Sequence, residues 1–104
     1  MQERFATLIK RFKPEAAKGV DARFHFKLSG KGGGEWYCEI KGGKLTVKQG
    51  DGPNKTASLR ASAEDYKKIA EGDMNKTWAF LRGKLKVEGD KDALSKWDSY
   101  FEKP

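Results

Sequence analysis

The chain of 104 residues has few of the side chains that most often build reactive centres, with one cysteine, Cys38, and one histidine, His25. A single thiol excludes a disulfide within the chain and a cluster of metal-binding thiolates, and it fits a reducing compartment. Catalysis by Cys38 would need an adjacent base. The strand parity of Cys38 matches that of Trp36 and Ile40, so we expect a small buried hydrophobe. The parity of His25 places it opposite the apolar positions, so we expect it to face solvent.

Long apolar runs are also missing. No stretch reaches the roughly 20 apolar residues that span a bilayer. The N-terminal sequence MQERFATLIK lacks the apolar core of a signal peptide. We therefore expect a cytoplasmic protein. The length fits one domain over residues 1–104, which is enough for one core and one cavity within it.

The glycine-rich stretch SGKGGGEWYCEI, residues 29–40, invites comparison with a phosphate-binding loop. Such a loop needs a Gly-Lys pair followed by Ser or Thr, placed between a strand and a helix whose N-terminal amides hold the phosphate. No Gly-Lys pair in this chain is followed by Ser or Thr, and the glycines lead into EWYCEIK, which alternates like a strand. The stretch predicts a hairpin turn, in which glycine supplies positive φ.

Positive charge is abundant and uneven. Residues 1–60 carry 13 Lys/Arg against 6 Asp/Glu, a net charge of +7, whereas residues 61–104 carry 9 of each. This pattern is typical of a protein with an anionic partner, such as nucleic acid, an anionic membrane surface or a ligand headgroup. Single-strand binders display aromatics on their basic face. Phe24, Phe26 and Trp36 instead share the parity of apolar residues, and only Tyr37 is placed outward. We therefore do not expect nucleic acid as the partner, although it stays an alternative.

Apolar periodicity outlines the secondary structure. Helical spacing predicts a first helix over residues 2–13. Alternation predicts three strands in an antiparallel meander, at residues 20–29, 35–41 and 44–48. Further elements follow in the order strand, helix, helix, strand and helix, at residues 57–61, 62–72, 75–83, 84–90 and 91–103. Ser62 and Asp90 have the side chains of helix N-caps. Helices segregated from a mostly antiparallel sheet indicate an α+β domain.

Three segments together resemble the sterol carrier protein 2 domain: FHFKLSGKGGGEWYCEIKGGKLTV, ASLRASAEDYKKIAEG and AFLRGKLKVEGD. The resemblance runs from about Val20 to the end, and its most specific part is Ala79-Phe80 followed by residues 83–90. It implies a five-stranded curved sheet covered on one face by about four to five helices, with a hydrophobic tunnel between the layers. It also implies binding or transfer of a fatty acid, fatty acyl-CoA, phospholipid or sterol, without catalysis by the domain itself. We expect no cofactor and no metal.

The ligand would lie between the apolar face of the sheet and the helices at residues 62–82 and 91–103. The candidate ligand-binding residues are apolar and come from both layers: Phe26, Trp36, Cys38, Ile40, Ile69, Met74, Trp78, Phe80, Leu81, Leu94, Trp97 and Phe101. Periodicity does not distinguish the walls of a cavity from a solid core. The leading hypothesis is a monomer that binds a lipid and meets an anionic membrane surface. A module that acts beside an enzyme is a further alternative.

Overall fold

The computed structural model describes the backbone of residues 2–102 and the side chains of residues 5–102. Its centre is a five-stranded sheet in the order β3-β2-β1-β4-β5. The strands are β1 (Ala22–Ser29), β2 (Gly34–Lys41), β3 (Lys44–Gln49), β4 (Ala57–Ser62) and β5 (Leu85–Gly89). Neighbouring strands are antiparallel except β1 and β4, which run parallel. The predicted α+β class and the mostly antiparallel sheet are confirmed.

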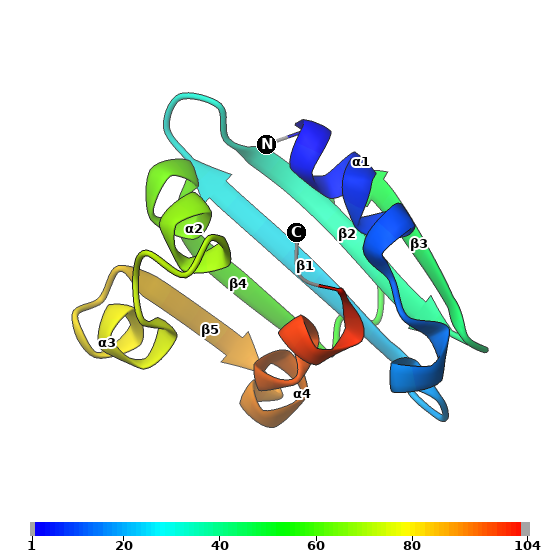
Figure 1. Cartoon of the computed structure of the whole chain (residues 1–104). Coiled ribbons are helices and arrows are strands. Elements are labelled where there is room, and N and C mark those ends of the chain that lie inside the picture. Colours follow the sequence, from blue (N-terminus) through cyan, green and yellow to red (C-terminus); the bar gives the residue numbers. More distant parts are fainter. Residues whose placement is uncertain (1, 103–104) are drawn as a thin grey trace.

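The helices form a second layer. They are α1 (Gln2–Arg11), α2 (Ala63–Ala70), α3 (Lys76–Leu81) and α4 (Lys91–Ser95), with 3-10 turns η1 (Pro14–Ala17) and η2 (Trp97–Tyr100). Figure 1 shows the four α-helices in front of one face of the sheet, with α1 near the β3 edge and α3 near the β5 edge. Within residues 2–102, no helix is long and apolar enough to cross a membrane.

Side chains at the helix starts explain where α2, α3 and α4 begin. The Ser62 hydroxyl accepts a hydrogen bond of 3.0 Å from the Asp65 amide, and the Asp90 carboxylate accepts one of 3.0 Å from the Ala93 amide. The Asn75 side chain caps α3 in the same way. These bonds satisfy amides that have no partner inside the helix. The predicted N-caps at Ser62 and Asp90 are confirmed.

The densest part of the core lies between β1, β2 and α1. Phe24, Phe26 and Cys38 are fully buried on the helix-facing side of the sheet. Phe5 of α1 stacks on Trp36 of β2, with ring centroids 4.6 Å apart. The buried position predicted for Cys38 is confirmed, and burial raises the pKa of its thiol to about 12. Ile9 shares the helical apolar pattern of α1 but is 55% exposed.

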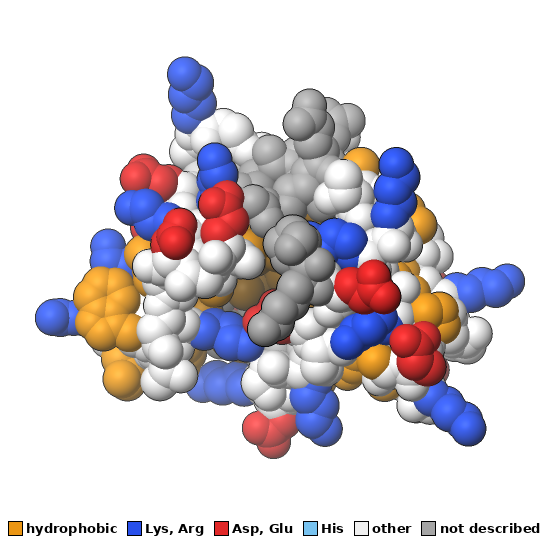
Figure 2. All heavy atoms as spheres, in the orientation of Figure 1, with side chains coloured by type: hydrophobic (Ala, Val, Ile, Leu, Met, Phe, Trp, Pro, Cys, Tyr) orange, Lys and Arg blue, Asp and Glu red, His pale blue; other side chains and the backbone are white. Residues whose placement is uncertain are grey.

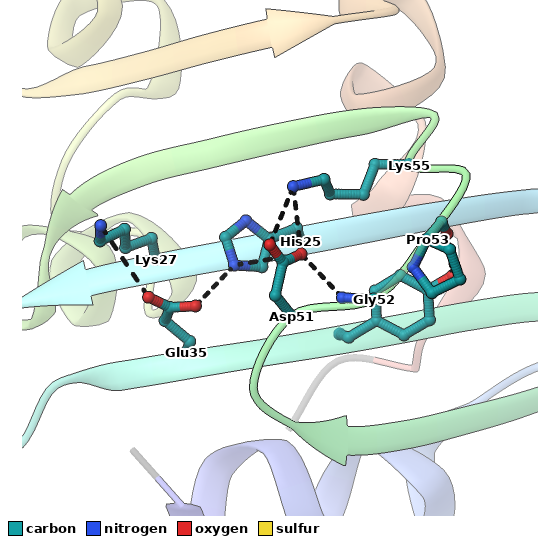
Figure 3. A network of polar contacts seen from close by, with 8 residues as sticks. His25, Lys27, Glu35, Asp51, Gly52, Pro53 and Lys55 are labelled. Carbon is teal, nitrogen blue, oxygen red and sulfur yellow. Dashed lines mark hydrogen bonds and ion pairs between the residues drawn. The ribbon is translucent and has the colours of Figure 1, made fainter.

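The face of the sheet away from the helices is partly covered, which corrects the prediction for His25. This residue lies on the predicted face, yet it is only 7% exposed. The loop of residues 50–56 folds over it. The Tyr37 hydroxyl donates a hydrogen bond of 2.5 Å to the Pro53 carbonyl, and His25 Nε2 lies 3.1 Å from a carboxylate oxygen of Glu35 (Figure 3). Alternation assigns a residue to a face but does not reveal a loop that covers that face.

The C-terminal segment is more irregular than the continuous helix predicted over residues 91–103. It consists of α4, the 3-10 turn η2 and then Phe101, which forms an isolated antiparallel bridge with Phe12. The Glu102 amide donates to the Arg11 carbonyl at 2.7 Å beside this bridge. The segment therefore pairs with the chain at the C-terminal end of α1 instead of continuing as a helix of its own. Lys103 lies outside the described residues.

Candidate functional site

An apolar cavity of about 250 Å³ lies between the helices and the β4–β5 side of the sheet. Leu59 of β4 and Leu85 and Val87 of β5 form its floor. Its walls come from α2, α3 and the C-terminal segment, through residues that include Ile69, Phe80, Leu94 and Trp97. These side chains are hydrophobic, so the cavity favours an apolar guest over water.

The cavity forms on this side because few helical side chains fill it. At the opposite side, α1 inserts Phe5 against Trp36 and leaves the interior solid. Over β4 and β5 the cover consists of short segments, and Ala79 is the buried residue of the six-residue helix α3. An alanine side chain reaches only a short way into the space between two layers. The interior is therefore incompletely filled beneath α2, α3 and α4.

Two lysines lie among the residues that line the cavity. The Lys76 ammonium is 2.9 Å from the Asp98 carboxylate, a contact that joins α3 to η2. The Lys91 ammonium is 5.2 Å from the centroid of the Phe80 ring. Because both side chains are exposed and Lys76 is already paired, Lys91 is the better placed cation for an anionic group that leaves the cavity.

The structure places the predicted site residues in three groups. Ile69, Phe80, Leu94 and Trp97 line the cavity. The buried residues of the solid core are Phe26, Trp36, Cys38, Ile40 and Phe101. The remaining group lies at or near the surface, with Met74 half-buried against the core, Trp78 45% exposed and Leu81 77% exposed.

Sequence reasoning missed the floor of the cavity. Leu59, Leu85 and Val87 fall within the strands predicted at residues 57–61 and 84–90, but none of them was a candidate ligand-binding residue. These residues form the floor because β4 and β5 are neighbours in the sheet and lie beneath the short helices α2, α3 and α4. β4 and β5 follow one another in the chain, separated by α2 and α3, and are also neighbours in the sheet. The sequence offered only the alternation of their apolar residues as a signal.

The single cysteine and the single histidine lie outside the lining of the cavity. The Cys38 thiol is buried and its pKa is raised to about 12, so it is uncharged near neutral pH. His25 lies on the other face of the sheet, with the sheet between it and the thiol. Among residues 2–102, no group of three or more His, Cys, Asp or Glu side chains is arranged to hold a metal ion. What the cavity offers is apolar surface with a cation at its edge.

Fold and cavity together define a small α+β domain built around an internal apolar site. The sequence profile of the SCP-2 sterol transfer family matches residues 5–102, and the chain belongs to that family. Membership implies a function in lipid binding or lipid transfer.

Proteins similar to this chain include much longer ones. The hydroxysteroid dehydrogenase-like protein 2 of Xenopus tropicalis is 36% identical over 92 residues, which cover 86% of this chain and 22% of that protein. The chain thus spans only about a fifth of the length of this relative.

Two solved structures share the fold. A stereoselective inverting sec-alkylsulfatase from Pseudomonas sp. superimposes with a TM-score of 0.85 at 19% identity, over 95% of this chain and 16% of the enzyme. Palmitated SCP2L2 from Aedes aegypti superimposes with a TM-score of 0.73 at 22% identity, over 94% of this chain and 87% of that protein.

Proposed function

We propose that this chain binds one lipid molecule without transforming it. The apolar tail lies in the cavity between α2, α3, α4 and the β4–β5 floor, and the polar end leaves the cavity beside Lys91. The observation that carries the proposal is the apolar cavity of about 250 Å³ in a chain of a lipid-binding family. The palmitated state of the Aedes aegypti protein, which has the same fold, supports it further.

The size of the cavity favours a slim ligand. Pockets for drug-sized molecules range from roughly 300 to 1,000 Å³, so a cavity of about 250 Å³ suits a flexible acyl chain better than a rigid sterol. A chain of about 16 carbons contributes roughly 12 kcal/mol when fully buried. The loss of ligand freedom costs several kcal/mol of this. We therefore expect a dissociation constant near one micromolar, about −8 kcal/mol. Among the candidate ligands, a fatty acid or a fatty acyl group is favoured.

The proposal includes the setting in which the domain works. We propose a monomer in the cytoplasm that exchanges its ligand with an anionic membrane.

A second candidate function is favoured by the length of the relatives, since this chain matches 22% of a dehydrogenase-like protein and 16% of a sulfatase. In that function the domain would hold a lipid for an enzyme that acts on it. Capture of such an enzyme on the immobilised chain would favour this second function.

The decisive measurement is native mass spectrometry of the chain purified from cells, before and after extraction with organic solvent. We expect a bound mass that matches a lipid and disappears on extraction. Binding of a fluorescent fatty acid to the extracted chain then gives the affinity. A chain that carries no lipid and binds no fatty acid, acyl-CoA or lysophospholipid contradicts the proposal.

A pair of matched variants tests the location. Ala70 and Lys67 are both exposed on α2, but Ala70 lines the cavity and Lys67 does not. Ala70→Trp narrows the cavity at its edge and should weaken fatty-acid binding more than about tenfold, because the ligand loses buried volume. Lys67→Trp adds the same side chain and should bind like the wild type. Equal binding by both variants would place the ligand elsewhere.

A further inference from the structure

The helix α3 exposes an unusual amount of apolar surface. Three of its side chains are large, hydrophobic and open to solvent: Trp78 at 45%, Phe80 at 41% and Leu81 at 77%. Scattered apolar residues are normal on protein surfaces, but a contiguous group on one short element marks a surface that contacts another body. We call these three residues the α3 patch.

Cations adjoin the α3 patch. The Arg82 guanidinium lies 5.7 Å from the centroid of the Trp78 ring, and the Lys91 ammonium lies 5.2 Å from that of Phe80. Lys84 is also exposed nearby in the sequence. Figure 2 shows hydrophobic side chains at the left of the molecule, over α3, with Lys and Arg side chains beside them. Acidic groups are present in the same region, and one of them, Asp98, is paired with Lys76.

An exposed tryptophan next to arginine and lysine is suited to the boundary of a bilayer. The indole ring prefers the level of the lipid headgroups, and basic residues at the same level attract anionic headgroups. A protein partner would also bury the apolar patch, but the cations that adjoin it match a surface of uniform negative charge. We therefore infer that the α3 patch docks on an anionic phospholipid bilayer.

The patch and the cavity meet at the same place. Phe80 belongs to the patch and also lines the cavity, and Lys91 contacts Phe80 from the cavity side. Docking of α3 thus brings the cavity edge to the membrane surface, and an acyl chain passes between bilayer and cavity with little exposure to water. This inference rests on the proposed lipid-binding function and adds the surface through which the ligand arrives.

Vesicle sedimentation tests the docking. The wild-type chain should bind vesicles of equal parts phosphatidylcholine and phosphatidylglycerol, and should bind vesicles of phosphatidylcholine alone more weakly. The double variant Trp78→Ser with Leu81→Ser should lose more than about tenfold in binding to the mixed vesicles, because bilayer affinity scales with inserted apolar area. Ile9→Ser is the matched control, since Ile9 is 55% exposed on α1, near the other edge of the sheet (Figure 1). Loss of binding in Ile9→Ser, with none in the double variant, overturns the inference.

Fluorescence identifies the inserted side chain. Trp36 and Trp97 are 4% and 6% exposed, so Trp78 is the tryptophan that a quencher in the bilayer can reach. The cavity is first filled with a fatty acid that carries no bromine, because Trp97 lines it and a brominated chain taken up there would quench Trp97 as well. Vesicle lipids brominated on the acyl chain should then quench part of the emission of the wild type. Trp78→Phe should abolish that quenching while vesicle binding persists. Quenching that remains in Trp78→Phe contradicts docking through α3.

Two further measurements separate this inference from the proposed function. Trp78 and Leu81 do not line the cavity, so the double variant should bind a fluorescent fatty acid normally without vesicles and transfer it to vesicles more slowly than the wild type. Failure of the wild type to bind any fatty acid refutes the proposed function. Vesicle sedimentation tests the docking independently of that result. Sedimentation velocity tests whether a second copy of the chain binds the α3 patch instead. A dimer that disappears in the double variant would assign the patch to that second copy and overturn the inference.

Discussion

The rings of Phe5 and Trp36 are stacked, with an angle of 4° between their planes and 4.6 Å between their centroids. The contact joins the N-terminal helix α1 to β2, far from each other in sequence. Phe5 also packs against Phe26, with ring centroids 5.3 Å apart. These contacts fill the interior on the α1 side completely, and the cavity is left on the other side of the same helical layer.

Phe5→Ala should be among the most destabilising single changes in this chain. Removing a fully buried phenylalanine costs about 3–5 kcal/mol of unfolding free energy, because a void replaces the ring contacts. Urea denaturation followed by circular dichroism measures this loss. Ile9→Ala on the same helix should change stability by less than about 0.5 kcal/mol, since Ile9 is exposed. Comparable losses in the two variants would mean that α1 does not pack as described.

Lys91→Gln should weaken the binding of a fatty acid but not of the fatty alcohol with the same chain. Lys91 is an exposed cation at the edge of the cavity, and an ion pair in such a setting contributes about 0.2–1 kcal/mol. The expected loss is therefore up to about fivefold for the acid. Titration of both ligands into both proteins measures it, with Lys84→Gln as the control outside the cavity. An equal loss for acid and alcohol would show that Lys91 acts through packing instead of charge.

Gly52→Ala should destabilise the loop that covers the outer face of the sheet. A methyl group at this position would lie 2.6 Å from atoms of the Tyr37 ring. Overpacking of this kind costs about 1–3 kcal/mol. In a Tyr37→Ala background the ring is gone, and the same substitution should cost close to nothing. A double-mutant cycle by urea denaturation gives the coupling, and additive effects would contradict the contact.

The Cys38 thiol gives a stability term that depends on pH. Its pKa is raised from 9.0 to about 12 by burial, so the folded state favours the neutral thiol. The contribution is fully present below pH 9 and is lost as the pH rises from there toward 12, because the unfolded chain gains stability as its thiolate forms. The difference in unfolding free energy between wild type and Cys38→Ala should therefore shrink across this window. Comparison with the variant removes the effect of lysines and tyrosines, which titrate in both proteins. A difference in unfolding free energy that stays constant with pH would show that folding does not shield the Cys38 thiol from ionisation.

Local patterns predicted much of the fold. Alternation between Phe24, Phe26 and Leu28 defines β1 and its inner face, and the residues are buried as the pattern requires. The caps at Ser62 and Asp90 act within four residues of themselves, so the sequence contains all the information they need. Periodicity supplied the five strands, and the family resemblance supplied the layer of helices on one face of the sheet.

The position of the cavity depends on contacts that periodicity does not encode. The parallel pairing of β1 with β4 joins segments on either side of the β2–β3 hairpin. That pairing moves β4 and β5 away from α1 and beneath the short helix α3. Trp78 and Leu81 follow a helical apolar pattern, but whether such a face meets the sheet or solvent is decided by neighbours distant in sequence. For the same reason, burial of His25 by residues 50–56 was not predictable from its strand.

The contact between Phe12 and Phe101 also bears on how the chain folds as it is synthesised. The interior is completed by rings from both ends, since Phe5 packs near the start and Trp97 packs against Phe26 near the end. A nascent chain whose residues 91–101 are still inside the ribosome can form the β2–β3 hairpin but cannot close this interior. Folding is therefore expected after translation of residue 101 and not progressively from the N-terminus. Until then the apolar strands of the emerging segment stay exposed and accessible to chaperones at the ribosome exit.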